Sequence, residues 1–136
     1  MLVYHVKMSR SPLLLRFLAQ ALLDPQQRRR LSEISFQDAG HGFDVFGLHP
    51  EWVQGMVALF QPLYKHWFRV SSHGAQNIPK QGAAILASNH SGMIPIDGTM
   101  IYCDVVSNTD PPRVPRPVTD PLVPALPGAR TIYAPC

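Results

Sequence analysis

Apolar residues recur at steps of three and four in two long stretches of the chain, which predicts two amphipathic helices. The first stretch covers residues 11–23, with Ser11 as a candidate cap and Pro12 in the first turn. Asp24 and Pro25 follow it and either end this helix or begin a new one. The second helix begins near Pro50, and its apolar face continues to residue 67. A third helix is expected over residues 100–106, which are mostly apolar.

Shorter apolar runs predict strands. Residues 83–87, Ala-Ala-Ile-Leu-Ala, are enough for one buried strand and too few for a helix. Residues 68–72 and 114–118 are two further candidates, although Pro115 and Pro117 weaken the last one. We therefore expect an α/β fold, with a mixed sheet and flanking helices, preceded by amphipathic helices.

Residues 35–50 contain glycines and aspartates that break any periodicity, which predicts a loop. Phe43, Val45 and Phe46 are the expected apolar anchors of this loop. His41 and His49 also belong to it, but no cysteine or glutamate stands at ligand spacing from them. No metal site is predicted here.

A polar loop follows the expected strand 83–87 and carries His90, and Asp97 stands at the start of the next helix. Ligands and catalytic groups in α/β sheets gather at the carboxyl ends of strands. A neutral imidazole can act as a general base near neutral pH. Asp97 would accept a hydrogen bond from the other ring nitrogen, and the helix dipole would favour its negative charge. Taken alone, this spacing still favours a structural histidine over a catalytic one.

The residues around His90 resemble the glycerolipid acyltransferases typified by 1-acylglycerol-3-phosphate acyltransferase. The family signature is an Asn-His pair after a strand, followed by an aspartate, and here it corresponds to Asn89, His90 and Asp97. The resemblance extends over about residues 52–127 and includes the approach to the motif, Tyr64-Lys65-His66-Trp67-Phe68-Arg69-Val70 and His73-Gly74-Ala75-Gln76-Asn77-Ile78-Pro79-Lys80-Gln81-Gly82. Six residues separate His90 from Asp97, where the common family spacing is four, and a subset of relatives is similar to this longer form.

The resemblance implies an acyltransferase that moves a fatty acyl group from acyl-CoA or acyl carrier protein to a lysophospholipid or glycerol-phosphate-type hydroxyl. It assigns the general base to His90 and the partner of the base to Asp97, with no cofactor besides the acyl thioester. Asn89, Ser91 and Gly92 would lie on the substrate side. Ser91 is not in a G-x-S-x-G elbow, so we do not expect it to be a nucleophile.

The same resemblance predicts the domain organisation. Residues 1–49 would form an amino-terminal helical and loop region, and residues 50–136 the first half of an acyltransferase domain. The family's second motif, with an arginine, and its third, Phe-Pro-Glu-Gly, are not found in the sequence. The chain is therefore expected to be an amino-terminal fragment.

The composition of the chain is consistent with association with a membrane surface. Hydrophobic residues make up 46% of the 136 residues and charged residues 15%, and the net charge is +3. Such a chain suits peripheral or monotopic association with the cytoplasmic side of a membrane, with no spanning helix. Arg28, Arg29 and Arg30 either form a solvated helix face or meet lipid head groups. No recognisable nucleic-acid motif accompanies the positive charge, so no nucleic-acid partner is expected.

Cys103 and Cys136 have neither zinc spacing nor a disulfide framework, and Cys103 is expected to be buried in an apolar helix. Two alternatives to the acyltransferase remain open. One is a non-catalytic membrane-surface module built on the helices of residues 11–23 and 51–68. The other is a metal-dependent hydrolase that uses His90 and Asp97 as ligands.

Overall fold

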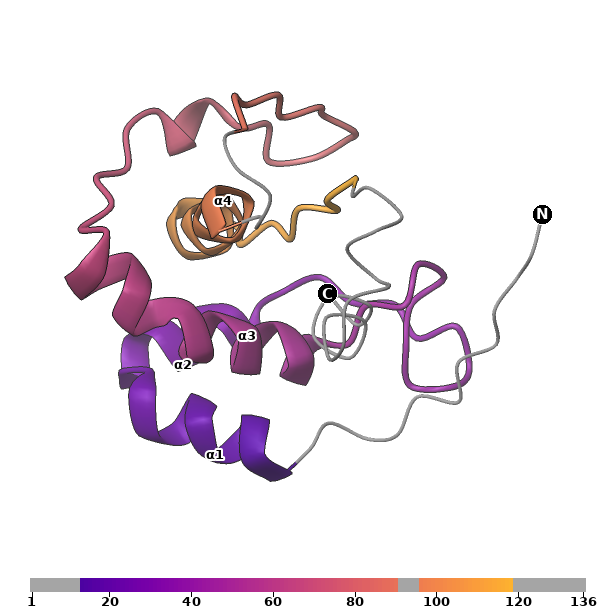
Figure 1. Ribbon diagram of the computed structural model, residues 1–136. Helices are drawn as coiled ribbons and strands as arrows, with labels where there is room; N and C mark the ends of the chain where they lie inside the picture. Colours follow the sequence, from indigo (N-terminus) through magenta and orange to yellow (C-terminus); the bar gives the residue numbers. More distant parts are fainter. Residues whose placement is uncertain (1–12, 91–95, 119–136) are drawn as a thin grey trace.

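A computed structural model of the chain describes residues 13–90 and 96–118 (Figure 1). The regular elements in these two ranges are helical. They are α1 (Leu13–Leu22), α2 (Pro25–Ser32), α3 (Pro50–Pro62), its π-helical continuation η1 (Leu63–Trp67), the 3-10 turn η2 (Ala75–Asn77) and α4 (Ile96–Asn108).

The junction between α1 and α2 is a capping box. The Asp24 carboxylate accepts a hydrogen bond from the Gln27 amide at 2.8 Å, and the Gln27 side chain accepts one from the Asp24 amide at 3.3 Å. Pro25 occupies the first helical position, where its missing N–H costs nothing. Asp24 and Pro25 therefore begin a new helix two residues after α1 ends.

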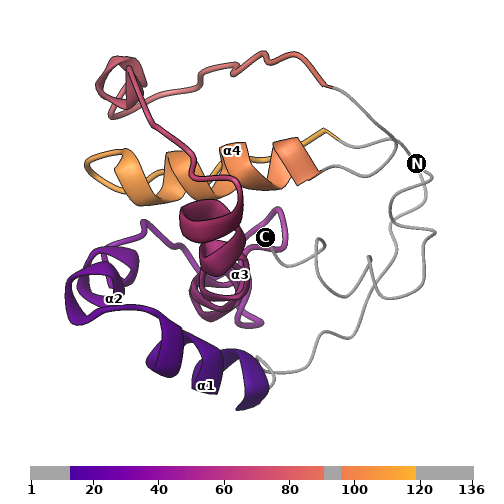
Figure 2. The ribbon, with the colours of Figure 1, turned by 60° about the vertical axis from the view of Figure 1, so that its left-hand side comes forward.

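Helix α3 lies at the centre of the helical assembly. In Figure 2, α1 lies on one side of α3 and α4 lies on the other. Val53, Val57 and Ala58 are at most 1% exposed, and the core that they share with α1, α2 and α4 also contains Leu31 and Val106. The two regions predicted from the sequence, 1–49 and 50–136, thus both contribute residues to one core.

The expected mixed sheet is wrong, because the two described ranges contain no β-strand. Residues 83–87 lack regular structure and are exposed; Ile85 is 98% exposed. Residues 68–72 and 114–118 are not strands either. A strand is stabilised when its N–H and C=O groups bond to a neighbouring strand. No described segment pairs with residues 83–87, and an apolar run cannot form a sheet without a partner.

The helix predictions are confirmed over the described residues. The three apolar stretches correspond to α1, to α3 with η1, and to α4, which begins four residues earlier than expected, at Ile96. Ser11 and Pro12 lie outside the described residues. Cys103 is buried on α4 as expected, whereas Cys136 lies outside the described residues. None of the described helices is long and apolar enough to cross a bilayer.

The loop before α3 corrects a second prediction. Phe43 is buried against Leu15 and Trp52 as expected, but Val45 and Phe46 are each 78% exposed. The Asp44 carboxylate accepts hydrogen bonds from the amides of Phe46 and Leu48, both at 2.8 Å, and the Gly47 amide donates to the Asp44 carbonyl at 3.0 Å. These bonds close a tight turn with Val45 and Phe46 at its tip, so neither side chain reaches the core.

Candidate functional site

His90 and Asp97 are in direct contact. His90 ends the exposed segment 83–90, and Asp97 is the second residue of α4. The His90 Nδ1 atom lies 2.8 Å from Asp97 Oδ1 and 2.9 Å from Asp97 Oδ2. An ionised carboxylate can only accept hydrogen bonds, so Nδ1 carries the proton in this pair. The neutral imidazole then presents Nε2 as a proton acceptor.

The start of α4 explains the position of the carboxylate. Asp97 lies in the first turn, where the helix dipole favours a negative charge, and the Gly98 amide donates to Asp97 Oδ1 at 2.8 Å. The His90 side chain is 54% exposed, and its Nε2 makes no hydrogen bond to the described part of the chain. The half-exposed ring therefore offers Nε2 as an acceptor that no described residue occupies.

Of the other expected site residues, the structure describes only Asn89. Asn89 is exposed and takes no part in regular structure. Ser91 and Gly92 lie outside the described residues. The structure therefore brings together His90 and Asp97, while the substrate-side roles of Asn89, Ser91 and Gly92 stay predictions.

Arg113, which was not among the expected site residues, binds the backbone just before the start of the segment 83–90. The Arg113 guanidinium donates through Nη2 to the Gly82 carbonyl at 2.7 Å and through Nη1 to the Pro79 carbonyl. These acceptors are backbone atoms 31 and 34 residues away in the chain. No sequence pattern signals such a contact, because any residue type can supply a carbonyl.

A polar network joins η1 to the other end of α4. The Tyr64 hydroxyl donates to Asp104 Oδ1 at 2.5 Å, Ser72 Oγ donates to Asp104 Oδ2 at 3.0 Å, and Asn108 Nδ2 donates to Asp104 Oδ1 at 2.8 Å. Burial and the neighbouring Asp104 carboxylate raise the pKa of Tyr64 to about 12. Every group of this network has a partner, so we assign it a structural role.

His41 and His49, the two histidines of the loop before α3, both lie beside the Phe43 ring. His49 caps α3, where its Nδ1 accepts a hydrogen bond from the Glu51 amide at 3.2 Å, and its ring packs against Phe43. Across the ranges that the structure describes, no three histidine, cysteine, aspartate or glutamate side chains come together in a metal-binding group.

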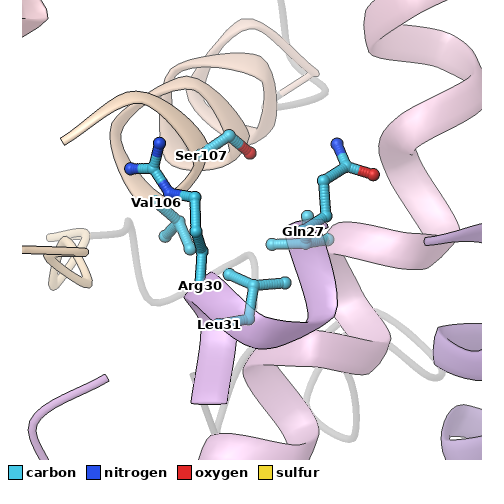
Figure 3. Close-up of a pocket in the computed structure, with 6 residues that line it drawn as sticks. Gln27, Arg30, Leu31, Val106 and Ser107 are labelled. Carbon is cyan, nitrogen blue, oxygen red and sulfur yellow. The ribbon is translucent and has the colours of Figure 1, made fainter. Parts of the chain in front are cut away.

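A small pocket lies between α2, α3 and α4 and is shown in Figure 3. Its empty volume is about 230 Å³, part of it open to solvent, which is below the usual size of a ligand site. Val106 and Ser107 place it in the last turns of α4, roughly 14 Å along the helix from Asp97. The pocket therefore does not belong to the His90–Asp97 pair. It is lined by Gln27, Arg30, Leu31, Val57, Val106 and Ser107.

The chain is similar to mycobacterial proteins of uncharacterized function. Over 62 residues, 45% of the chain, it is 40% identical to uncharacterized proteins of Mycobacterium tuberculosis and Mycobacterium bovis, and over 59 residues it is 37% identical to one of Mycobacterium leprae. The match spans 17% of the length of the first two relatives and 16% of the third. No family model matches the sequence, and no solved structure is significantly similar to it.

Proposed function

We propose that the protein is an acyltransferase in which His90 is the general base and Asp97 orients it. The contact of His90 Nδ1 with both oxygens of Asp97 carries this proposal. It is supported by the half-exposed imidazole, whose Nε2 no described residue occupies. The donor is an acyl thioester of coenzyme A or of acyl carrier protein, and the acceptor is a lysophospholipid or related alcohol.

The reaction needs no nucleophile from the protein. The acceptor oxygen attacks the thioester carbonyl while its proton moves to His90 Nε2. Asp97 stabilises the imidazolium that forms, because its carboxylate remains hydrogen-bonded to Nδ1–H. When the carbon–sulfur bond breaks, the proton passes from Nε2 to the departing thiolate. The base is neutral again, and the products are an ester and a free thiol.

Peripheral attachment to a membrane is part of the same proposal, because the acceptor is a lipid. Helix α1 is apolar on two faces. Leu15 and Ala19 are buried in the protein, whereas Leu13, Leu14 and Phe17 are 82%, 64% and 66% exposed. An amphipathic helix places such an exposed apolar face at the boundary between head groups and acyl chains. Nothing in the described residues favours the metal-dependent hydrolase, since the pair lacks a third ligand there.

The activity test compares two histidine variants. Acyl transfer from a long-chain acyl-CoA to a lysophospholipid in vesicles is followed by release of the free thiol. We expect His90→Gln to lower kcat by about 100-fold or more, the usual contribution of a general base. His73→Gln is the matched control, because His73 is exposed and remote from the pair in sequence. Asp97→Asn should lower kcat as His90→Gln does, since an amide no longer selects the Nδ1–H tautomer. A folded His90→Gln variant with full activity would refute the role of the base.

The membrane test compares two pairs of exposed apolar residues. Flotation with vesicles of phosphatidylcholine and phosphatidylglycerol measures binding of the whole chain. Replacing Leu14 and Phe17 together by serine should weaken binding by at least about tenfold, because two large apolar side chains no longer enter the lipid. Replacing Val45 and Phe46 by serine removes a similar exposed pair from the loop and is the control. Equal losses in both variants would rule out a specific role for α1.

A further inference from the structure

The segment that carries His90 runs along α4 in the opposite direction to the helix. Figure 1 shows α4 end-on with this segment beside it, and Figure 2 shows the segment following the helix along its length. The thirteen residues of α4 span about 20 Å, and eight extended residues reach at most about 28 Å. Residues 83–90 are therefore long enough to link the two ends of the helix.

Hydrophobic packing does not hold this segment in place. All eight residues from 83 to 90 are exposed, and the described residues offer them no partner strand. At its far end the His90–Asp97 contact is half-exposed, and such contacts contribute little because solvent screens them. The segment is therefore held by polar contacts, the His90–Asp97 contact at this end and an attachment at its other end.

That attachment is Arg113, whose own position is set by the end of α4. The Arg113 amide donates to Thr109 Oγ1 at 2.8 Å, and Thr109 Oγ1 donates to the Val105 carbonyl in the last turns of α4 at 2.7 Å. Thr109 is buried. The guanidinium then bonds to the carbonyls of Pro79 and Gly82, the turn that immediately precedes the segment. A planar fork with two parallel donors fixes orientation as well as distance, which a lysine cannot do.

We propose that Arg113 is a positioning residue for His90. It fixes the start of the segment at the carboxyl end of α4, so that the segment delivers His90 to Asp97 at the amino end of the same helix. The importance of this role for catalysis rests on the proposed function. The placement of His90 itself can be tested without any activity.

The test reads the tautomer of His90 by ¹⁵N NMR of the whole chain labelled at histidine, with His90→Gln used to assign the ring signals. The wild-type chain should show the Nδ1–H tautomer that Asp97 selects. Arg113→Met should lose this dominant signal, and Arg113→Lys should retain it in part. Arg116→Met is the matched control, because Arg116 contacts Asp44 and Phe46 in a different loop. It should keep the wild-type spectrum.

A second variant protects the test against misfolding of Arg113→Met. Gly82 has φ +80°, and a Cβ atom added to it would have no other atom within 4 Å, so Gly82→Ala strains only the turn that supplies one acceptor carbonyl. It should also lose the Nδ1–H signal. A folded Arg113→Met or Gly82→Ala chain with the wild-type spectrum would overturn the proposal.

The kinetic arm separates this inference from the proposed function. If the wild-type chain transfers acyl groups, Arg113→Met should lower kcat by about 100-fold with little change in KM, as expected when a catalytic group is displaced by about 1 Å. A kcat that is unchanged in that variant would count against positioning. If the wild-type chain is inactive but the tautomer still depends on Arg113, the positioning role stands and the proposed function fails.

Discussion

The crossing of α1 and α3 makes a sharp prediction about Gly55. A Cβ atom built on this buried glycine would lie 2.6 Å from Leu15 Cβ and 3.1 Å from both Leu15 Cγ and Cδ2. Because the nearest atom is a Cβ, a change of the Leu15 rotamer cannot remove the clash. Gly55→Ala must push α1 away from α3.

Two opposing terms set the size of this effect. Alanine is more favourable than glycine inside a helix by about 1 kcal/mol. Overpacking in a well-packed core costs about 1–3 kcal/mol. Displacing α1 also disturbs the cluster of Leu15, Phe43 and Trp52, so we expect a cost near the upper limit. The net result is a loss of about 2 kcal/mol in the free energy of unfolding.

Urea unfolding measures this loss. Gly55→Ala should lower the midpoint with little change in the slope, because the surface exposed on unfolding is nearly the same. Gly98→Ala on α4 is the matched control, since no atom lies within 4 Å of its added Cβ. This variant should be neutral or more stable by about 0.5 kcal/mol. If Gly55→Ala were as stable as the wild type, the close approach of α1 to α3 would be refuted.

Two further predictions concern pH. The pKa of Tyr64 is raised to about 12 in the folded chain. The contribution of Tyr64 to the free energy of unfolding is therefore complete below pH 10, the ordinary tyrosine pKa, and is lost as the pH rises from 10 to 12. Tyr64→Phe should remove this decline of stability with pH from unfolding curves measured in alkali. Burial opposes the shift at Asp44, but the amides of Leu48 and Phe46 and the Arg116 guanidinium outweigh it and hold the carboxyl pKa below its usual value. The contribution of Asp44 to the free energy of unfolding is therefore present above about pH 3.9 and is lost as the pH falls through the lower pKa of the folded chain. Asp44→Asn should reduce stability at neutral pH and should make stability fall less steeply in acid. An unchanged dependence of stability on pH in acid would contradict this reasoning.

The helices could be predicted from the sequence because their signals are local. The four-residue spacing of Trp52, Met56, Phe60 and Tyr64 predicts the helix that α3 and η1 form, and Asp24 with Pro25 indicates a helix boundary, which the structure shows to be the start of α2. The exposed outer face of α1 could not be predicted in this way. Leu13, Leu14 and Phe17 are as apolar as Leu15 and Ala19, so composition does not tell which side meets the core.

The sheet was predicted wrongly because pairing is not a local property. Residues 83–87 have the length and apolarity of a buried strand, but their backbone groups need a partner from elsewhere. The described residues offer no such partner. The contacts of Arg113 could not be predicted for a similar reason. Its acceptors are the backbone carbonyls of Pro79 and Gly82, and every residue type has a backbone carbonyl.

A sheet was expected to bring His90 and Asp97 together, but other contacts place the two residues. Asp97 is placed by the first turn of α4, and the start of the segment that ends at His90 is placed by Arg113 at the other end of that helix. Neither attachment involves a sheet, which is why the pair can form where no strand exists in the described residues. Neither involves α1. Effects at distant sites without shared partners are usually additive, so Gly55→Ala should lower stability and leave the His90 tautomer unchanged, whereas Arg113→Met should change the tautomer with a smaller loss of stability. A Gly55→Ala chain that remains folded but loses the tautomer would show that the site depends on the whole helical core and not on α4 alone.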